Sequence, residues 1–343
     1  MKQEYTLVDL FSGGGGFARG FEQAGYTILA GVDNYPPAAR TYKTNYPQAA
    51  VVGDDIKEVR GEDLLSLMGL SRGELDVVIA SPPCEPFTGA NPNRMKDPLD
   101  RLYTDPAGQL FLHAIRLIGE LKPRVFVIEN VPGILHRPIQ QAIRRELART
   151  GYPRVYFNQL KAEDYGTPSK RLRIFVSNHQ ITPPRMRQVT VEEALRGLPP
   201  PGSPWPPNHD HPAEPPRRHR RRLHRLKWGE HLIEYRGAGG RRLPNYIRLH
   251  PHRLAPTVMG TSRFIHPYED RLLTVREQAR LMGYPDHHVF LGSRDAQYNM
   301  VGEAVPPPLA KAIALYISTL LGGHGDGGDN TGAPQREQRA EAS

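Results

Sequence analysis

The sequence contains very little cysteine and no long apolar run. Its 343 residues include one cysteine, Cys84, so an internal disulfide framework is excluded. No cluster of cysteine and histidine has the spacing of a zinc site, and we expect no metal centre. No segment approaches the roughly 18 apolar residues of a membrane span, and the first residues, MKQEYTLVDLF, lack the apolar core of a signal peptide. These absences predict a cytoplasmic protein without a membrane partner.

Negative charge is also in short supply. The chain has 45 Lys and Arg residues against 36 Asp and Glu, which gives a formal net charge of +9. Excess positive charge favours a polyanionic partner, because cations that neutralise phosphates release counterions. A codon bias toward arginine would also raise the charge. Here, however, the positive charge is densest in PPRRHRRRLHR, residues 215–225. This segment predicts nucleic-acid contacts from its six arginines, Arg217, Arg218, Arg220, Arg221, Arg222 and Arg225.

Seven short segments rich in valine, isoleucine, leucine and phenylalanine predict buried β-strands. They occupy residues 5–11, 26–33, 49–54, 75–81, 124–130, 154–160 and 173–178. Helical patterns lie between several of them, for example at 17–25 and at 108–122, where the pattern ends before Pro123. This alternation predicts an α/β fold with a largely parallel sheet and helices on both faces. In such folds ligands bind beyond the carboxyl ends of the strands.

The second half of the chain has a different composition. Residues 182–253 are rich in proline, arginine and histidine, and the alternation of strands and helices disappears. We expect a small irregular domain or a long insertion there. Helical patterns return at 274–282 and 308–321, and residues 322–343 have the composition of a disordered tail. The expected parts of the chain are therefore 1–181, 182–253, 254–321 and 322–343.

A glycine run, DLFSGGGGFARGFEQAG, lies between the first strand and the first helix. Glycine allows a sharp turn and a close approach to a ligand, and the helix start offers free N–H groups. Asp33, at the end of the next strand, could bind the two hydroxyls of a ribose. The third glycine of G-x-G-x-x-G is missing, because Ala18 follows Gly13 and Gly15 and Arg19 follows Gly14 and Gly16. The run therefore favours S-adenosylmethionine over a dinucleotide and disfavours an oxidoreductase. A glycine turn without a ligand is the alternative.

The single cysteine follows the fourth strand, in SPPCEPFTG (residues 81–89). Amino-group methyltransferases end this strand with a similar turn, S/N/D-P-P, followed by an aromatic residue that stacks on a base. Here Cys84 stands in that place. A thiolate that adds to carbon 6 of a pyrimidine makes carbon 5 nucleophilic enough to attack a methyl sulfonium. The alternative interpretation, a small buried hydrophobic residue, explains neither the position nor the prolines.

Two further strand ends carry groups that such an addition needs. ENVPG (129–133) ends the fifth strand, and a protonated or proton-sharing Glu129 could bond ring N3 and the exocyclic amine. SKRLR (169–173) opens the seventh strand. Arg171 and Arg173 alternate by two and so point to one face, where they could hold the base carbonyl and a neighbouring anion. The alternative for Glu129 is a helix-capping acid or a loop carboxylate, and a basic strand end alone is also typical of a solvated segment.

These motifs, in this order, resemble the DNA cytosine-5 methyltransferase family. DLFSGGGGF, PPCEPFT, ENVPGIL, KRLRIFV, RLLTVREQARLMGYP and GEAVPPPLAKAIA carry the resemblance, over roughly 5–178 and 254–321. It implies a Rossmann-like, S-adenosylmethionine-binding catalytic domain (1–181), a target-recognition region (182–253) and a C-terminal part (254–321) whose last helix packs back on the catalytic domain.

The resemblance also implies roles for individual residues. Cys84 is the implied nucleophile, Glu129 and Arg173 contact a flipped cytosine, and Arg171 supports them. Glu85 and Thr88, next to the nucleophile, are implied DNA contacts. The implied cofactor contacts are Phe11, Gly13, Gly14, Gly15, Gly16, Asp33, Asp55, Ile56, Pro83, Leu110, Glu303 and Val305.

The sequence departs from the family pattern at three positions. Glu85 replaces the usual glutamine after the cysteine, which puts the usual groove contact of that residue in doubt. Glu303 replaces the asparagine of G-N-A/S-V, and Ser169 replaces a glutamine before the arginine motif. None of these changes removes the nucleophile.

Double-stranded DNA is the expected partner, methylated by a monomer associated with the nucleoid. The sequence leaves open whether the chain belongs to a restriction–modification pair with a cognate endonuclease. An RNA cytosine-5 methyltransferase and a catalytically silent DNA-binding regulator are the alternatives. Cys84, Glu129 and Arg173 argue against the silent regulator, whereas the arginine-rich segment does not distinguish duplex DNA from tRNA.

Overall fold

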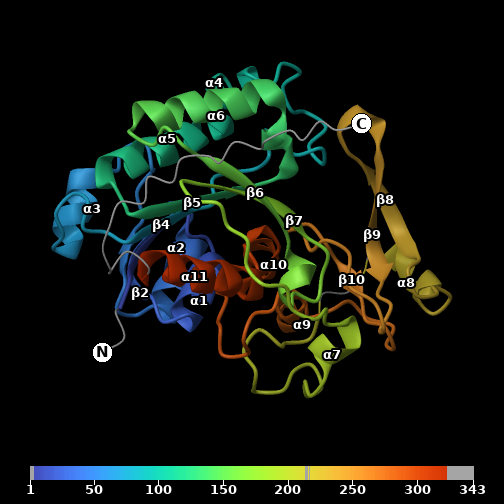
Figure 1. Ribbon diagram of the computed structural model, residues 1–343. Helices are drawn as coiled ribbons and strands as arrows, with labels where there is room; N and C mark the ends of the chain where they lie inside the picture. Colours follow the sequence, from blue (N-terminus) through green and yellow to red (C-terminus); the bar gives the residue numbers. More distant parts are fainter. Residues whose placement is uncertain (1–3, 213–214, 216, 323–343) are drawn as a thin grey trace, which may run out of the picture.

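The computed structural model describes residues 4–212, 215 and 217–322. Its centre is a seven-stranded sheet in the order β3-β2-β1-β4-β5-β7-β6 (Figure 1). The strands are β1 (Thr6–Leu10), β2 (Thr27–Val32), β3 (Ala50–Val52), β4 (Val77–Ala80), β5 (Val125–Asn130), β6 (Tyr156–Lys161) and β7 (Leu172–Ser177). All seven predicted strands are present. Only β7 runs antiparallel to its neighbours β5 and β6, so the prediction of a largely parallel sheet is confirmed.

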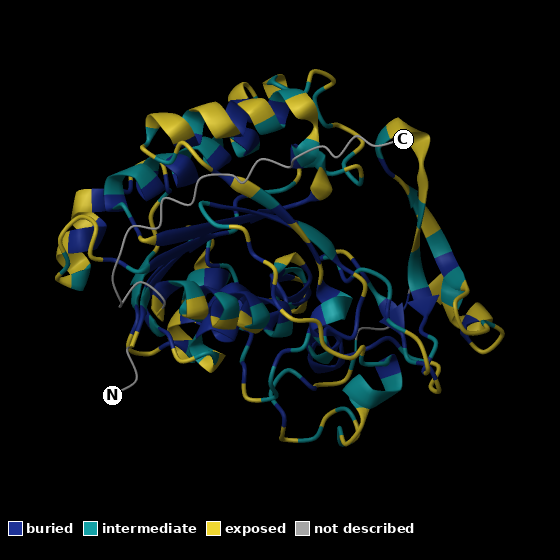
Figure 2. Ribbon diagram, viewed as in Figure 1, coloured by how far each residue is buried: buried dark blue, intermediate teal, exposed yellow. Residues whose placement is uncertain are grey.

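Helices cover both faces of this sheet. The helices of the first half are α1 (Gly16–Gln23), α2 (Pro36–Asn45), α3 (Gly61–Met68), α4 (Asp100–Tyr103), α5 (Pro106–Leu121) and α6 (Arg137–Arg149), with 3₁₀ turns η1 (Pro132–Leu135) and η2 (Ala162–Tyr165). One apolar core joins the sheet to α3, α5 and α6, and a second joins it to α1 and the C-terminal helix. Figure 2 shows the central strands buried and the outer faces of the helices exposed.

The predicted α5 shows how local sequence sets an element. The Asp105 side chain accepts hydrogen bonds from the N–H groups of Ala107 and Gly108, and Pro106 occupies the first helical position. Phe111, Ile115, Ile118 and their neighbours on one stripe are buried against the sheet. The helix ends at Leu121, as expected from the proline two residues beyond.

The second half contains more regular structure than its composition indicates. It forms α7 (Val191–Leu195), α8 (Arg217–Leu223), β8 (His231–Arg236), η3 (Ala238–Gly240), β9 (Arg242–Arg248), β10 (Phe264–Ile265), α9 (Val275–Leu281), α10 (Arg294–Glu303) and α11 (Pro307–Gly322). Strands β8 and β9 form an antiparallel hairpin, and β10 adds parallel to β9. Leu223, Leu232, Ile265 and Leu272 form a small core beneath it. The hairpin rises beside the seven-stranded sheet in Figure 1.

The last helix packs against the first. A Cβ atom on Gly20 of α1 would lie 2.3 Å from the Cβ of Ala310 in α11, so the two backbones are in close contact.

The stretch Arg294–Gly322 is long and apolar enough to span a membrane by length and composition alone, with a mean hydropathy of 1.3. Half of its most apolar part is buried inside the protein, and the stretch consists of two helices, α10 and α11. We therefore interpret it as core. The predicted tail beyond Gly322 lies outside the described residues.

Candidate active site

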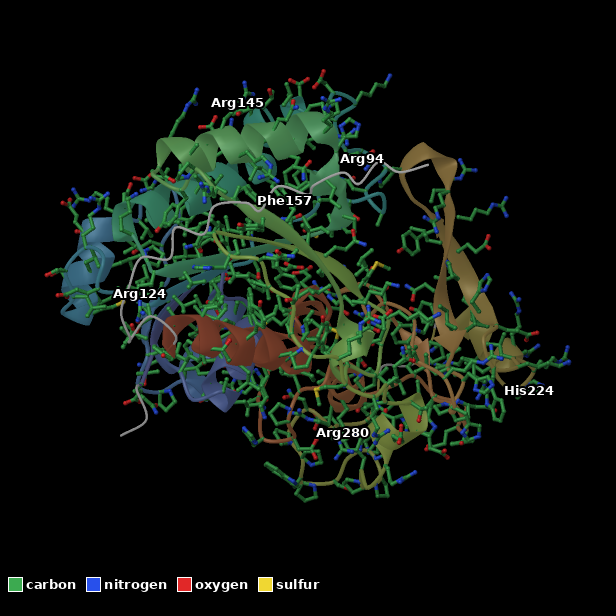
Figure 3. The ribbon with its side chains drawn as sticks, in the orientation of Figure 1. Arg94, Arg124, Arg145, Phe157, His224 and Arg280 are labelled. Carbon is green, nitrogen blue, oxygen red and sulfur yellow. The ribbon has the colours of Figure 1, made fainter. Side chains whose placement is uncertain are left out.

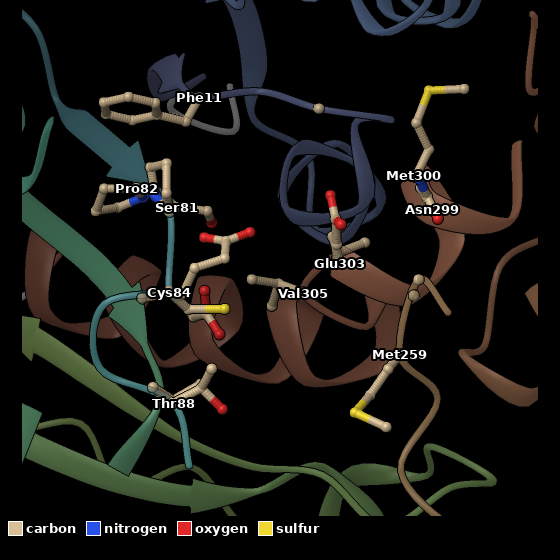
Figure 4. A pocket seen from close by; sticks show the side chains of 18 of the residues that line it. Phe11, Ser81, Pro82, Cys84, Thr88, Met259, Asn299, Met300, Glu303 and Val305 are labelled. Atoms are coloured by element: carbon tan, nitrogen blue, oxygen red, sulfur yellow. The ribbon is translucent and has the colours of Figure 1, made fainter. Parts of the chain in front are cut away.

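A cavity of about 1170 Å³ lies at the carboxyl ends of β1, β2, β4 and β5. The hairpin β8–β9, residues 256–264 and the end of α10 form its opposite wall. All four residues expected to carry the chemistry, Cys84, Glu129, Arg171 and Arg173, line it. Figure 4 shows Cys84, Glu303 and Val305 facing the same space. The cavity is also lined by Phe11, Gly13, Gly14, Gly16, Asp33, Asp55, Ile56, Pro83, Glu85, Thr88 and Leu110.

The turn that carries Cys84 is fixed by hydrogen bonds on both sides. The Ser81 N–H donates to the Leu10 carbonyl on β1 (3.1 Å), and the Asn130 side chain at the end of β5 donates to the Pro82 carbonyl (3.1 Å). The Cys84 carbonyl accepts from the N–H groups of Phe87 and Thr88, both at 3.0 Å. The ring of Phe87 is buried. The thiol is thus held at the strand ends by the sheet rather than by a loose loop.

The thiol is protonated at neutral pH in the protein without a substrate. Burial and, after it, the negative charges of Glu85 and Glu129 together raise the pKa of Cys84 to about 11, against the opposing effect of Arg173 and Arg171. A thiol in this state is a poor nucleophile. Attack therefore requires a group that accepts the proton when a substrate binds.

Glu129 and Arg173 form an ion pair that faces the cavity. The Arg173 Nε lies 2.8 Å from the Glu129 Oε1, and the two side chains are only 12% and 7% exposed. The antiparallel direction of β7 explains the pairing, because it brings the beginning of β7 beside the end of β5. The ion pair fixes both side chains at the cavity wall. The expected bond from a protonated or proton-sharing Glu129 to ring N3 stays a prediction.

Arg171 also lines the cavity but is fully buried. Its Nη1 donates to the carbonyls of Val258 (2.8 Å) and Gly302 (3.0 Å), and its Nε is buried without a partner among the described residues. Burial, together with the charge of Arg173, lowers the pKa of Arg171 to about 9. Arg171 thus ties the segment before β7 to the C-terminal half of the cavity wall. This position suits a supporting role more than direct contact with a ligand.

The glycine turn and Asp33 define the other end of the cavity. The Gly13 N–H donates to the Asp33 Oδ2 (2.8 Å), and the Tyr35 N–H donates to Oδ1 (2.9 Å), so the carboxylate is fixed in orientation. Burial raises the pKa of Asp33, although these two N–H groups oppose the shift. Phe11 lies in the left-handed backbone region, with φ 58°. Such strain in a non-glycine residue is typical of functional sites.

Two of the four glycines are required by protein packing. A Cβ on Gly15 would lie 2.6 Å from the ring of Tyr46, and one on Gly16 would lie 2.3 Å from the Tyr284 hydroxyl. A Cβ on Gly14 would be 3.2 Å from that of Met300, whereas no atom lies within 4 Å of one on Gly13. Gly15 does not line the cavity. The glycine run therefore lets α10 and the segment before it pack closely behind the turn.

The end of the cavity beside the glycine turn also contains polar atoms that find no hydrogen-bond partner among the described residues. Both carboxylate oxygens of Asp9 and the hydroxyls of Ser12 and Ser81 are buried, line the cavity and make no hydrogen bond of standard geometry. Burial, and next the charge of Asp33, raises the pKa of Asp9 well above its usual range, although the Tyr42 hydroxyl and an N–H group face it. Unpaired buried polar atoms are costly. Donors and acceptors of this kind, beside an apolar floor, fit the amino acid and nucleoside parts of S-adenosylmethionine.

The hairpin β8–β9 contributes cavity residues that were not predicted from the sequence, namely Tyr235, Arg241, Leu243, Pro244 and Ile247. Its tip contacts the loop that follows Cys84, because the Ala238 N–H donates to the Gly89 carbonyl (2.9 Å). Figure 3 labels Arg94 in the loop that faces this tip. The alternation in HLIEYR and RLPNYIR around GAGG is a hairpin signal, so the sequence did contain the information.

The six arginines of 217–225 lie away from the main cavity. They sit in and just after α8, all are exposed, and none lines that cavity. Arg222 instead lines a smaller hollow with His231, Arg236 and Arg242 of the hairpin. His224, labelled in Figure 3, marks the outer end of this region. Contact of these arginines with nucleic acid stays a prediction. Elsewhere in residues 4–212, 215 and 217–322, no group of three His, Cys, Asp or Glu side chains could hold a metal ion.

Comparison with known proteins identifies the relatives of this chain. The C-5 cytosine-specific DNA methylase family matches residues 5–195 and 216–319. A Methanocaldococcus jannaschii protein, provisionally named type II methyltransferase M.MJ0563P, is 46% identical over 92% of this chain and all of its own length. Type II methyltransferase M.DdeI of Desulfomicrobium norvegicum is 30% identical over 91% of this chain and 88% of its own length.

Solved structures agree with these relatives. A crystal structure from Escherichia coli, described as a prophage-encoded DNA modification methyltransferase, superposes with a TM-score of 0.74 at 25% identity. It covers 93% of this chain and all of that chain. The Spodoptera frugiperda DNMT2 mutant superposes with a TM-score of 0.60 at 18% identity, over 93% of this chain and 99% of that chain, and this likeness concerns the fold alone.

Proposed function

Because the chain belongs to the C-5 cytosine-specific DNA methylase family, we propose that it methylates carbon 5 of a flipped cytosine in a specific duplex sequence through a covalent Cys84 adduct. It is a DNA cytosine-5 methyltransferase of the type found in restriction–modification systems. The observation that carries the mechanism is the position of the only thiol. Cys84 and the Glu129–Arg173 ion pair line one cavity, at the ends of three neighbouring strands.

The raised pKa of Cys84 defines the first step. The thiol attacks carbon 6 only when its proton leaves, and ring N3 of the cytosine is the site that gains a proton as the S–C6 bond forms. In the proposed step Glu129 takes this proton and passes it to N3, and its second oxygen accepts from the exocyclic amine. The position of Glu129 in the same cavity as Cys84 supports this role. The Arg173 guanidinium binds the carbonyl oxygen of the base, and Arg171 supports this arrangement from behind.

Carbon 5 becomes nucleophilic in the adduct and takes the methyl group. S-adenosylmethionine supplies that group as a methyl sulfonium, and its use is implied by the family. Loss of the proton from carbon 5 and cleavage of the S–C6 bond then restore the aromatic ring and the free thiol. The residues that would hold the cofactor are those expected from the sequence: Phe11, Gly13–Gly16, Asp33, Asp55, Ile56, Pro83, Leu110, Glu303 and Val305. Gly15 acts only through the shape of the turn.

The DNA enters between the catalytic sheet and the hairpin. Glu85 and Thr88 follow the nucleophile and line the cavity, and Arg94 and Arg241 add positive charge from its two walls. Residues 1–181 and 254–321 form the catalytic part, and 182–253 the recognition part, with the arginines of α8 on backbone phosphates. The enzyme acts as a cytoplasmic, nucleoid-associated monomer, with a cognate endonuclease as the partner in a restriction–modification pair.

Transfer of a labelled methyl group tests this function against both alternatives. The chain is incubated with labelled S-adenosylmethionine and duplex DNA, and separately with tRNA. Label on carbon 5 of cytosine in DNA supports the proposal. Label on tRNA alone indicates the RNA enzyme, and DNA binding without methyl transfer indicates a silent regulator. Bisulfite sequencing of DNA from cells that express the chain then gives the recognition sequence.

A further inference from the structure

The backbone of the glycine turn is fixed by one hydrogen bond from each of several distant segments. The Gly13 N–H binds Asp33, and the Tyr46 hydroxyl donates to the Gly15 carbonyl (2.6 Å). The Gly14 carbonyl is held by His288, whose Nε2 lies 2.8 Å away and 274 positions later in the chain. His288 is therefore the direct side-chain link between the C-terminal segment and the cofactor turn.

The contacts of His288 determine which ring nitrogen carries the proton. The Arg19 Nε can only donate, and it lies 3.1 Å from the His288 Nδ1, so Nδ1 must be an unprotonated acceptor. Nε2 then carries the proton and donates to the Gly14 carbonyl. The ring is fully buried, packed on Tyr284 with 4.7 Å between ring centroids and on Phe290 at 5.0 Å. Both nitrogens are thus used, and the ring has no freedom to turn.

The charged and titratable groups around the ring keep it neutral. Arg19 of α1 and Arg276 of α9 face it with positive charge, and Tyr46, Tyr284 and His287 complete its surroundings. Burial, and next the charge of Arg19, lowers the pKa of His288 well below its usual range. The neutral form, with the proton on Nε2, is the one that the geometry requires.

We propose that His288 is a positioning residue for the cofactor, which holds the Gly14 carbonyl away from the cavity and so keeps the Gly13–Gly16 turn in its binding shape. The inference rests on the proposed use of S-adenosylmethionine. A rotated Gly14 peptide would leave the Nε2–H of the buried His288 without a partner, which is costly. His288 and Arg19 thus couple the position of the C-terminal segment to the affinity of the Gly13–Gly16 turn for S-adenosylmethionine.

The test compares cofactor affinity in matched histidine variants of the full chain. His288→Phe keeps the ring and removes both hydrogen bonds, whereas His288→Gln retains one donor and one acceptor. His209 is the control, because it is equally buried but bridges Thr274 (2.8 Å) and Pro199 (2.7 Å), outside the cofactor turn. Calorimetric titration gives the dissociation constant of S-adenosylmethionine, and thermal melting reports general stability.

We expect His288→Phe to weaken S-adenosylmethionine binding about tenfold, the equivalent of about 1.4 kcal/mol, and His288→Gln to restore most of it. His209→Phe lowers the melting temperature but leaves the dissociation constant nearly unchanged. Equal affinity of His288→Phe and wild type overturns the inference, as does equal weakening by His209→Phe. A wild-type chain that binds no S-adenosylmethionine would instead contradict the proposed function.

Nuclear magnetic resonance on the wild-type chain tests the same inference if His288→Phe does not fold. Long-range ¹⁵N–¹H spectra distinguish the two neutral forms of a histidine ring, and the His288→Gln variant assigns the signal. We expect the Nε2-protonated form at neutral pH, with and without the cofactor. The Nδ1-protonated form, or a mixture of the two, would contradict the hydrogen bond to Gly14.

Discussion

The reactivity of Cys84 in the free enzyme follows quantitatively from its surroundings. With a pKa of about 11, the thiolate fraction at pH 7.5 is about 300-fold smaller than for an ordinary thiol of pKa about 8.5. The thiolate itself is about tenfold more nucleophilic, because nucleophilicity rises with pKa. Reaction with an aromatic disulfide should therefore be about 30-fold slower than that of an unhindered thiol. The absence of other cysteines makes the assay unambiguous.

The direction of the pH dependence follows from the raised pKa. The neutral thiol is favoured in the folded protein, so the reaction rate should rise about tenfold per pH unit up to about pH 10. Glu85→Gln removes one of the charges that raise the pKa, and it should speed the reaction about threefold for each pKa unit that it recovers. The urea-unfolded chain, as a control, should react at the ordinary rate. A folded wild-type thiol that titrates near its usual pKa and reacts at the unfolded rate would refute this reasoning.

Three further predictions concern packing and DNA. Gly16→Ala should lower the melting temperature markedly, because its Cβ would lie 2.3 Å from the Tyr284 hydroxyl and 2.7 Å from the Val305 carbonyl; unchanged melting would contradict the packing described here. Neutralising two or three arginines of α8 should weaken DNA binding and reduce the slope of log affinity against log salt by about 0.9 per lost phosphate contact. Unaltered salt dependence would mean that these side chains face solvent. Extrusion of the base costs a few kcal/mol, and a mismatch lowers that cost. A mispaired target cytosine should therefore bind more tightly than a paired one, and 2-aminopurine at that position should brighten on binding. Weaker binding and a dark probe would argue against base flipping.

The elements that the sequence predicts well are those with strong local signals. The central strands β4 and β5 are buried at every position, and α5 has both a capping residue and an amphipathic stripe. The Cys84 turn is similarly local, since the prolines and the strand end are adjacent in the chain. The meeting of Glu129 and Arg173 follows once the order of motifs is known, although their ion pair depends on the antiparallel direction of β7.

The elements that the sequence does not reveal depend on distant partners. Helix α10 has little amphipathic pattern, because it packs on α9 and also on the glycine turn, where Met300 lies beside Gly14, rather than on one flat surface. Glycine is needed at positions 15 and 16 because a Cβ there would collide with Tyr46 and Tyr284, which lie far along the chain. His288 sits in an unremarkable loop sequence, and only the fold brings it to Gly14. Each of these features is a long-range contact without a local signature.

Trapping of a covalent complex tests the central claim most directly. A duplex with 5-fluorocytosine at the target position blocks loss of the substituent at carbon 5, so the S–C6 bond cannot break after methyl transfer. With S-adenosylmethionine present, the wild-type chain should form a denaturation-resistant complex joined through the Cys84 peptide. Cys84→Ser should bind the cofactor but form no such complex and transfer no methyl group. Full methyl transfer by Cys84→Ser, or a complex joined through any other residue, would contradict the account.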